Sequence, residues 1–160
     1  MIGMSNHKKN KENIKKIVDK SKESPVFFTH EVIGDRLWKK QRDIINAVQE
    51  NDVSVASCHG AGKSFIASRI VLHGLSSYPG TQIITTAPTD RQVRKILWKE
   101  IATGYNNSKI PIGGKLLTKE LQLDKDWFAF GFATSGTNQF QGFHAKRILV
   151  VADEAAGIPE

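Results

Sequence analysis

A glycine-bearing stretch in the first half of the chain carries residue types that could hold phosphate. It is Ser57-Cys58-His59-Gly60-Ala61-Gly62-Lys63-Ser64, between the apolar run Val53 to Ala56 and a helical pattern from Phe65. Glycines let a loop curl tightly, and the N–H groups of such a loop and of the following helix point at phosphate oxygens. Lys63 would contact the β- and γ-phosphates, and the Ser64 hydroxyl would ligate Mg²⁺. The stretch therefore predicts binding of a nucleoside triphosphate such as ATP.

This motif departs from the standard pattern at its first position, where Ser57 replaces a glycine. At average residue frequencies, Gly-Lys followed by Ser or Thr occurs by chance in roughly one chain in twelve of this length. An ordinary strand-to-helix turn is the alternative interpretation of the loop alone.

A second stretch, near the end of the chain, supports the phosphate interpretation. The apolar run Ile148 to Ala152 is followed directly by Asp153 and Glu154. An unbroken apolar run of this length is typical of a strand covered on both faces, and α/β sheets place ligands at the carboxyl ends of such strands. We expect Asp153 to hold, through a water, the Mg²⁺ that Ser64 also holds, and Glu154 to polarise the water that attacks the γ-phosphate. The alternative is a strand capped by a polar turn.

Composition limits what kind of protein this can be. The chain has 160 residues, enough for one domain, and 39% of them are hydrophobic. Its one cysteine, Cys58, excludes an internal disulfide, and no stretch resembles a signal peptide or a membrane span. We therefore expect a cytosolic protein that does not enter membranes. We also expect the large side chains of Trp38, Trp98 and Trp127 to anchor its core.

The net charge of +7 is concentrated at the N-terminus, because residues 1–22 hold seven lysines against Glu12 and Asp19. We expect residues 1–24 to form a lysine-rich segment, either disordered or a solvated helix, ahead of a domain at 25–160. Lysine-rich segments bind phosphate backbones without sequence preference, and they also serve as plain solubilising tails. Both interpretations stay open.

The elements that must position these motifs alternate between helix and strand. An irregular lead-in is expected at 25–35 and a β-hairpin around Asp124-Lys125-Asp126, where leucines and phenylalanines alternate on either side. Together the pattern predicts a doubly wound α/β sheet. The expected helices are 36–50, 65–75 and 88–103, and the expected strands are 53–56, 81–87 and 148–152.

Four stretches resemble the N-terminal ATPase part of the large terminase subunit, the motor that packs double-stranded DNA into the heads of tailed phages. The resemblance covers roughly residues 25–160. It implies a P-loop NTPase fold of the RecA or ASCE kind, with a mostly parallel sheet flanked by helices and a small β-hairpin insertion. The stretches are Leu37 to Arg42, Ser57 to Ser64, Thr85 to Thr89, and Phe140 to His144 with Ile148 to Ala155.

The resemblance assigns roles to the matching residues. Gln41 becomes a candidate adenine contact, because its amide both donates and accepts; a surface helix glutamine is the alternative. Catalytic roles fall to Lys63 and Glu154, and Mg²⁺ ligation falls to Ser64 and Asp153. The predicted ATP-binding loop comprises Ser57, Cys58, His59, Gly60, Ala61, Gly62, Lys63 and Ser64, of which Cys58 and His59 act as spacers contacting through the backbone.

The resemblance also implies partners and a place of action. It implies double-stranded DNA, a portal protein, a small terminase subunit and a homo-oligomeric ring, acting in the host cytoplasm at the procapsid portal. Full-length relatives continue with further strands and a nuclease domain beyond the position that matches Glu160. We therefore expect the sheet to be incomplete at its carboxyl end and the isolated chain to hydrolyse ATP weakly.

Two other function classes remain. A helicase-superfamily ATPase acting on nucleic acid shares the glutamine, the phosphate loop and the Asp-Glu pair. The residues Ala155-Ala156-Gly157 after the Asp-Glu pair favour the terminase resemblance over it. A non-catalytic nucleotide-binding or DNA-tethering module would depend on the lysine-rich segment and a degenerate loop.

Overall fold

A five-stranded mixed sheet forms the centre of the chain. The computed structural model describes residues 3–134 and 145–154, so Phe140 to His144 and Ala155 of the predicted motifs lie outside the described residues. β1 pairs in parallel with both β4 and β5, whereas β3 pairs antiparallel with β2 and β4. The sheet order is β2-β3-β4-β1-β5, with bounds Lys115–Leu116, Glu120–Asp124, Trp127–Ala133, Gln82–Ala87 and Ile148–Ala152.

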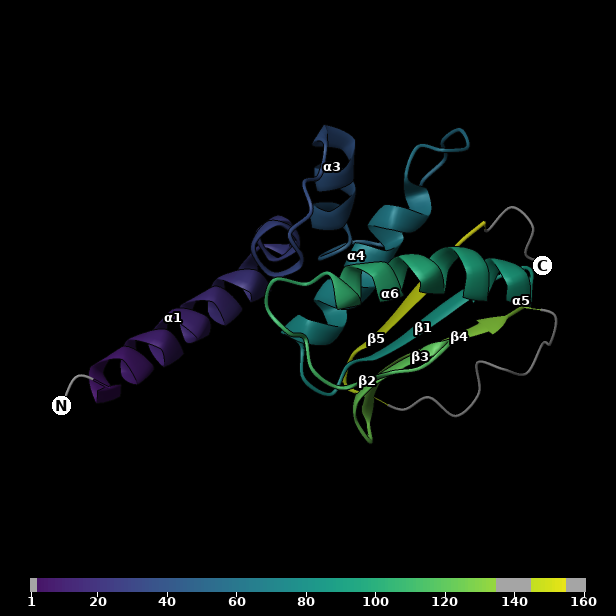
Figure 1. The fold of residues 1–160 in the computed structure, drawn as a ribbon. Helices are drawn as coiled ribbons and strands as arrows, with labels where there is room; N and C mark the ends of the chain where they lie inside the picture. Colours follow the sequence, from purple (N-terminus) through teal and green to yellow (C-terminus); the bar gives the residue numbers. More distant parts are fainter. Residues whose placement is uncertain (1–2, 135–144, 155–160) are drawn as a thin grey trace.

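Helices pack against one face of this sheet, where α4 and α6 lie across the strands (Figure 1). The mixed α/β class is therefore as predicted. The doubly wound, mostly parallel arrangement is not, because the described helices cover one face and two of the four strand pairings are antiparallel. Among the described residues every helix is too short or too polar to cross a lipid bilayer. The helices are α1 (Gly3–Glu23), α2 (Pro25–Phe27), α3 (Lys39–Ala47), α4 (Lys63–Ser77), α5 (Asp90–Gln92) and α6 (Trp98–Asn106), with π-helical turns η1 (Phe28–Ile33) and η2 (Val93–Leu97).

β1 is the most deeply buried strand, because it lies between two parallel neighbours and beneath the helices. Trp98 at the start of α6 is buried and donates from Nε1 to Thr85 Oγ1 on β1 at 2.9 Å. Gly131 on β4 is the register partner of Thr85, and a Cβ at Gly131 would collide with Trp98 Nε1. A glycine on β4 therefore lets the indole ring reach the sheet.

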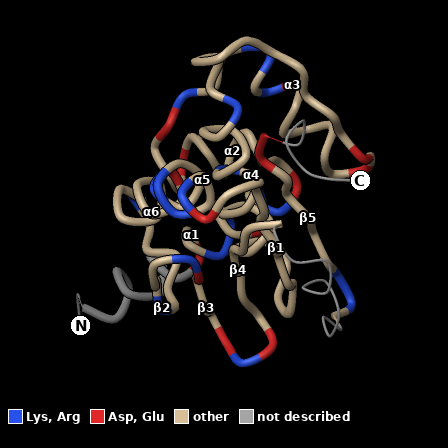
Figure 2. The backbone as a smooth tube through the Cα atoms, turned by 90° about the vertical axis from the view of Figure 1, so that its right-hand side faces the viewer, with Lys and Arg blue, Asp and Glu red and all other residues tan. Residues whose placement is uncertain are grey.

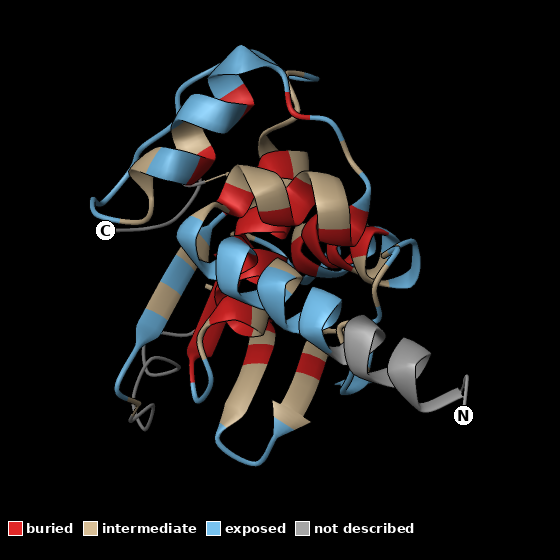
Figure 3. Cartoon of the chain, turned by 90° about the vertical axis from the view of Figure 1, so that its left-hand side faces the viewer, coloured by how far each residue is buried: buried red, intermediate tan, exposed pale blue. Residues whose placement is uncertain are grey.

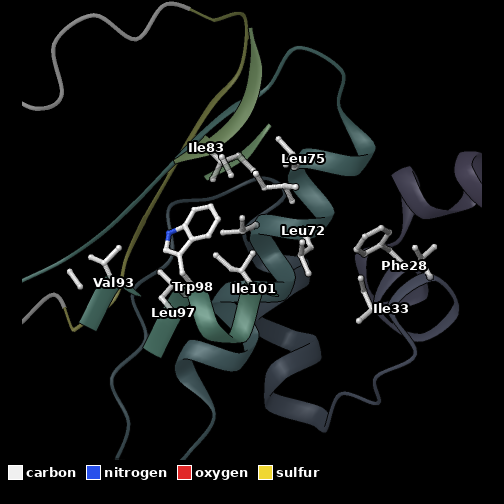
Figure 4. Close-up of a cluster of buried hydrophobic side chains, with 14 residues drawn as sticks. Phe28, Ile33, Leu72, Leu75, Ile83, Val93, Leu97, Trp98 and Ile101 are labelled. Carbon is white, nitrogen blue, oxygen red and sulfur yellow. The ribbon is translucent and has the colours of Figure 1, made fainter. Parts of the chain in front are cut away.

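The main hydrophobic core lies between the sheet and α4 (Figure 3). Leu72 and Leu75 on α4 are fully buried, with side chains from η2 and α6 on one side and from η1 on the other (Figure 4). α4 is therefore buried around most of its circumference, as its apolar composition requires. The other labelled members are Phe28, Ile33, Ile83, Val93, Leu97, Trp98 and Ile101.

A buried arginine on α4 ties three parts of the fold together. Arg69 donates from Nε to Asp35 Oδ2 at 2.8 Å and from Nη1 to the Glu100 carbonyl at 3.0 Å. Its Nη2 forms an ion pair with the same Asp35 oxygen, and its guanidinium lies 4.1 Å from the ring centroid of Phe65. Because nearly all its donors are used inside the protein, the buried charge is compensated.

The lysine-rich segment forms α1, which extends away from the sheet (Figure 1). Its C-terminal end is anchored to α4, where the buried His73 donates from Nε2 to the Ser21 carbonyl at 2.9 Å. Burial lowers the pKa of His73 to about 4, with the Arg147 charge acting in the same direction. His73 is therefore neutral at physiological pH and holds α1 as a hydrogen-bond donor.

Three predictions about the elements were wrong. The lead-in at 25–35 is largely helical, as α2 and η1, because Ser24 caps the turn that Pro25 begins. The hairpin of β3 and β4 is not an insertion, since β4 pairs with β1 within the main sheet. Trp38 does not anchor the core: its relative exposure is 52%.

The predicted strand 53–56 also fails to form. Residues 52–58 form no regular element and pair with no strand among the described residues, and Val53 and Val55 are 37% and 38% exposed. The run alternates valine with small residues, which offer little apolar surface to bury in a sheet. By contrast, the predicted strand 148–152 forms as β5, although it is not covered on both faces as predicted, since Ile148 and Val150 are 43% and 51% exposed.

Candidate functional site

The loop before α4 turns through two glycines whose backbone conformation few other residues adopt. Gly60 and Gly62 have φ of 77° and 80°, in the left-handed region that favours glycine. α4 begins immediately afterwards at Lys63, and no side chain caps its first turn. The N–H groups of that turn and the positive end of the helix dipole are thus left for a ligand beside the loop.

Lys63 folds back over this loop. Its Nζ donates to the carbonyl oxygens of Ser57 at 3.1 Å and Cys58 at 3.0 Å. The ammonium group is therefore held close to the N-terminal end of α4 without a carboxylate partner among the described residues. Ser57, Cys58, His59 and Gly60 are exposed, and Ala61 is half-buried, so the loop is open to a solvent-borne ligand.

The serine that follows is joined to the acidic pair at the other end of the chain. Ser64 Oγ donates to Asp153 Oδ2 at 2.7 Å, across a separation of 89 residues. Asp153 is buried and lies just beyond the carboxyl end of β5, where its N–H donates to the Thr86 carbonyl of β1 at 2.8 Å. The structure thus brings the two motifs together at the carboxyl edge of the parallel strands.

Glu154 is the one non-glycine residue with a positive φ, 54°, among those the structure describes. This region is uncommon for residues that carry a Cβ, and such conformations cluster at functional sites. Its carboxylate is half-buried and has no hydrogen-bond or ion-pair partner within the described ranges. An unpartnered carboxylate therefore lies next to the paired Asp153.

Gln41 is buried on α3 and packs directly against the loop. Its Nε2 lies where it would be 2.8 Å from a Cβ at Gly62, and its Oε1 accepts a 3.4 Å hydrogen bond from the N–H of Trp38. Gln41 thus helps to start α3 and also holds α3 beside the loop. It is not the surface helix glutamine of the alternative interpretation.

A cavity of about 550 Å³ opens beside Gln41, between α3 and the extended segment 53–57. Its walls are largely apolar, and it reaches the loop at Gly62 and Lys63. Sequence reasoning missed it, because it assigned Trp38 to the core and 53–56 to the sheet. The lining residues that matter here are Trp38, Gln41, Ile44, Val55, Lys63 and Ile66.

Comparisons with known proteins identify no relative. No family model, no curated protein and no solved structure matches this chain.

Proposed function

We propose that the chain binds ATP with Mg²⁺ and hydrolyses it, as the ATPase part of a DNA-translocating motor resembling the large terminase subunit. The observation that carries this proposal is the contact between Ser64 Oγ and Asp153 Oδ2. It places a hydroxyl and a carboxylate at the same helix N-terminus as a left-handed glycine loop and a lysine. Triphosphate binding uses this combination of groups.

The Ser64 and Asp153 oxygens are suited to Mg²⁺. This ion takes six oxygen ligands at about 2.0–2.1 Å, which puts neighbouring ligand oxygens roughly 2.9 Å apart. The observed separation of 2.7 Å is close to that value. No cluster of three or more metal-binding side chains occurs in the described residues, so phosphate and water oxygens would complete the set. When bound, Mg²⁺ neutralises charge on the β- and γ-phosphates.

The remaining residues act on the nucleotide and on water. The N–H groups of Gly60 to Ser64 donate to phosphate oxygens. Lys63 exchanges its two carbonyl partners for phosphate oxygens, which form stronger, charge-assisted hydrogen bonds. Glu154, whose carboxylate has no partner among the described residues, accepts a hydrogen bond from the attacking water and orients it.

The base of the nucleotide fits the cavity beside the loop. Trp38, Ile44 and Val55 offer apolar surface to its ring faces, and the Gln41 amide can pair with its polar edge. The cavity reaches the loop at Gly62, so a single ligand can span both parts of the site.

Lys63→Ala tests this proposal. Because Lys63 would contribute charge-assisted hydrogen bonds, we expect the affinity for a fluorescent ATP analogue with Mg²⁺ to fall by about 10- to 100-fold. Lys125→Ala, at the tip of the β3–β4 hairpin, is the matched control and should leave the affinity unchanged. Equal affinities for both variants would overturn the nucleotide site.

A second variant separates binding from chemistry. Glu154→Gln should retain nucleotide affinity and lose about 10²- to 10⁴-fold in hydrolysis rate, the usual contribution of a positioned acid–base group. Hydrolysis at an unchanged rate would remove Glu154 from the mechanism.

A third experiment separates the motor from the helicase alternative. A packaging motor should translocate duplex DNA without separating its strands, whereas strand separation would favour the helicase.

A further inference from the structure

The outer face of the helical run from α5 to α6 carries a row of basic side chains. Arg91, Lys95 and Lys99 are exposed and lie four residues apart, on α5, η2 and α6 respectively. Residues four apart lie on roughly the same side of both α-helical and π-helical turns, so the three cations share one side of the run. Figure 2 shows basic positions along this run.

The acidic residues of the same run are already paired elsewhere. Asp90 accepts from Lys119 Nζ at 2.6 Å and lies 3.5 Å from Arg94 Nη1. The Lys119 hydrogen bond, with the charges of Lys119 and Arg94, lowers the pKa of Asp90, so its carboxylate stays ionised with its own partners. Glu100 faces the buried Arg69 at 3.8 Å.

Arg91, Lys95 and Lys99 consequently face solvent as free cations. In residues 3–134 and 145–154, none of the three has an ion-pair partner. An uncompensated row of this kind attracts a polyanion.

The opposite side of the run decides which polyanion fits. Val93, Leu97, Trp98 and Ile101 are buried in the core, and Ile96, at 43% exposure, is the one exposed large apolar side chain of this run. A single side chain offers too little apolar surface to insert into a membrane. Protein interfaces are depleted in lysine at their centres, which disfavours a protein partner. Phosphates of a nucleic-acid strand need only closely spaced cations.

We propose that this cationic face, Arg91, Lys95 and Lys99, contacts the phosphate backbone of duplex DNA. This proposal rests on the proposed motor function, because it assigns a surface to the DNA that such a motor would move. α5 begins just after β1 ends, and the Thr86 carbonyl of β1 accepts the N–H of Asp153. The face therefore starts at the sheet edge that holds the candidate nucleotide site, so a shift at that edge can be passed to bound DNA.

The test is the salt dependence of DNA binding. The Lys95→Ala/Lys99→Ala double variant is compared with Lys115→Ala/Lys125→Ala, which removes two exposed lysines at the hairpin end of the sheet. The probe is a fluorescent random-sequence DNA duplex, bound to the whole chain without nucleotide. Each phosphate contact contributes about −0.9 to the slope of log K against log salt, so the first variant should lose about two units of slope.

At fixed salt we expect the Lys95/Lys99 variant to bind the duplex about tenfold more weakly, equally for all sequences. The hairpin variant should match the unmodified chain. An unchanged slope in the first variant, or equal losses in both, would overturn the proposal. The proposal would also be overturned if the Lys95/Lys99 variant lost binding to an anionic polypeptide or an anionic vesicle but kept its binding to the duplex.

Failure of this inference is distinguishable from failure of the proposed function. Lys63→Ala should lose nucleotide binding and keep nucleotide-free DNA binding, because Lys63 lies outside the cationic face. If Lys63→Ala keeps nucleotide affinity while the Lys95/Lys99 variant loses DNA, the nucleotide site is wrong and the DNA face stands. The reverse result removes the DNA face alone.

Discussion

Two apolar runs flank the candidate site, and they end differently. Residues 148–152 form β5, paired in register with β1 from Gln82↔Ile148 onward. Residues 53–56 are exposed and form no strand among the described residues. Both runs were predicted to be buried strands, yet Ile148 and Val150 on β5 are 43% and 51% exposed, more than Val53 and Val55 at 37% and 38%. Strand formation here therefore follows from pairing with a neighbouring edge and not from the burial of the run.

The two runs also belong to differently packed parts of the molecule. On the β5 side, Leu149 and Val151 pack against the core between the sheet and α4. On the other side, the segment that leads into the loop and α3 line the two sides of an open cavity. We therefore expect stability to reside on the core side and ligand binding to depend on the other.

The largest expected effect on stability comes from the core side. Arg69→Ala should lower the free energy of unfolding by about 3 kcal/mol, because it removes several buried hydrogen bonds and leaves Asp35 without its partner. Urea titration followed by circular dichroism measures this. Arg94→Ala, which breaks an exposed arginine–aspartate pair, should cost at most about 0.5 kcal/mol. Equal losses of unfolding free energy in the two variants would contradict the expectation that stability resides on the core side.

A pH titration gives an effect of similar size. Unfolded His73 titrates near 6.5 and folded His73 near 4, so both states are neutral above pH 6.5 and stability is complete there. As the pH falls from 6.5 to 4, the unfolded state takes up a proton that the folded state refuses, which destabilises the protein by about 3 kcal/mol in total. Below pH 4 this loss stops growing.

His73→Gln removes that titration and keeps a donor for the Ser21 carbonyl. Its unfolding free energy should fall less steeply than that of the unmodified chain between pH 6.5 and pH 4. Parallel pH profiles for the two proteins would show that His73 is solvated and that α1 is not anchored through it.

The smallest effect compares the two runs directly. Val151→Ala should cost about 1 kcal/mol, because it removes methyl groups packed against the core, and Val55→Ala should change stability by less than about 0.5 kcal/mol. Thermal unfolding of the two variants gives the comparison. A loss for Val55→Ala as large as that for Val151→Ala would mean that residues 53–56 are packed as a strand after all.

The sequence predicts what depends on local pattern. Helices α3 and α4 and strands β1 and β5 follow from apolar periodicity, and the left-handed turns follow from Gly60 and Gly62. Pairing is not local, so the union of β4 with β1 could not be predicted from the alternation that identifies the hairpin. The exposure of 53–56 depends on a missing partner, which the residues themselves do not encode.

The candidate site shows the same limit. The sequence predicts that Ser64 and Asp153 meet, and they do. That prediction assumed a sheet strand at 53–56 leading into the loop, and no such strand forms among the described residues. The burial of Gln41, by contrast, depends on how α3 packs on the loop. Arg69 has no sequence signal at all, since a charged residue within a helical pattern is normally placed on the outer face.

The left-handed backbone at Glu154 affects how this chain would respond to directed evolution for thermostability. A side chain in that conformation costs about 1 kcal/mol or more relative to glycine. A library selected only for heat resistance should accumulate glycine at position 154, and the carboxylate would be lost with it. Directed evolution of a more thermostable variant therefore needs a second screen, for ATP hydrolysis, that retains the glutamate at position 154.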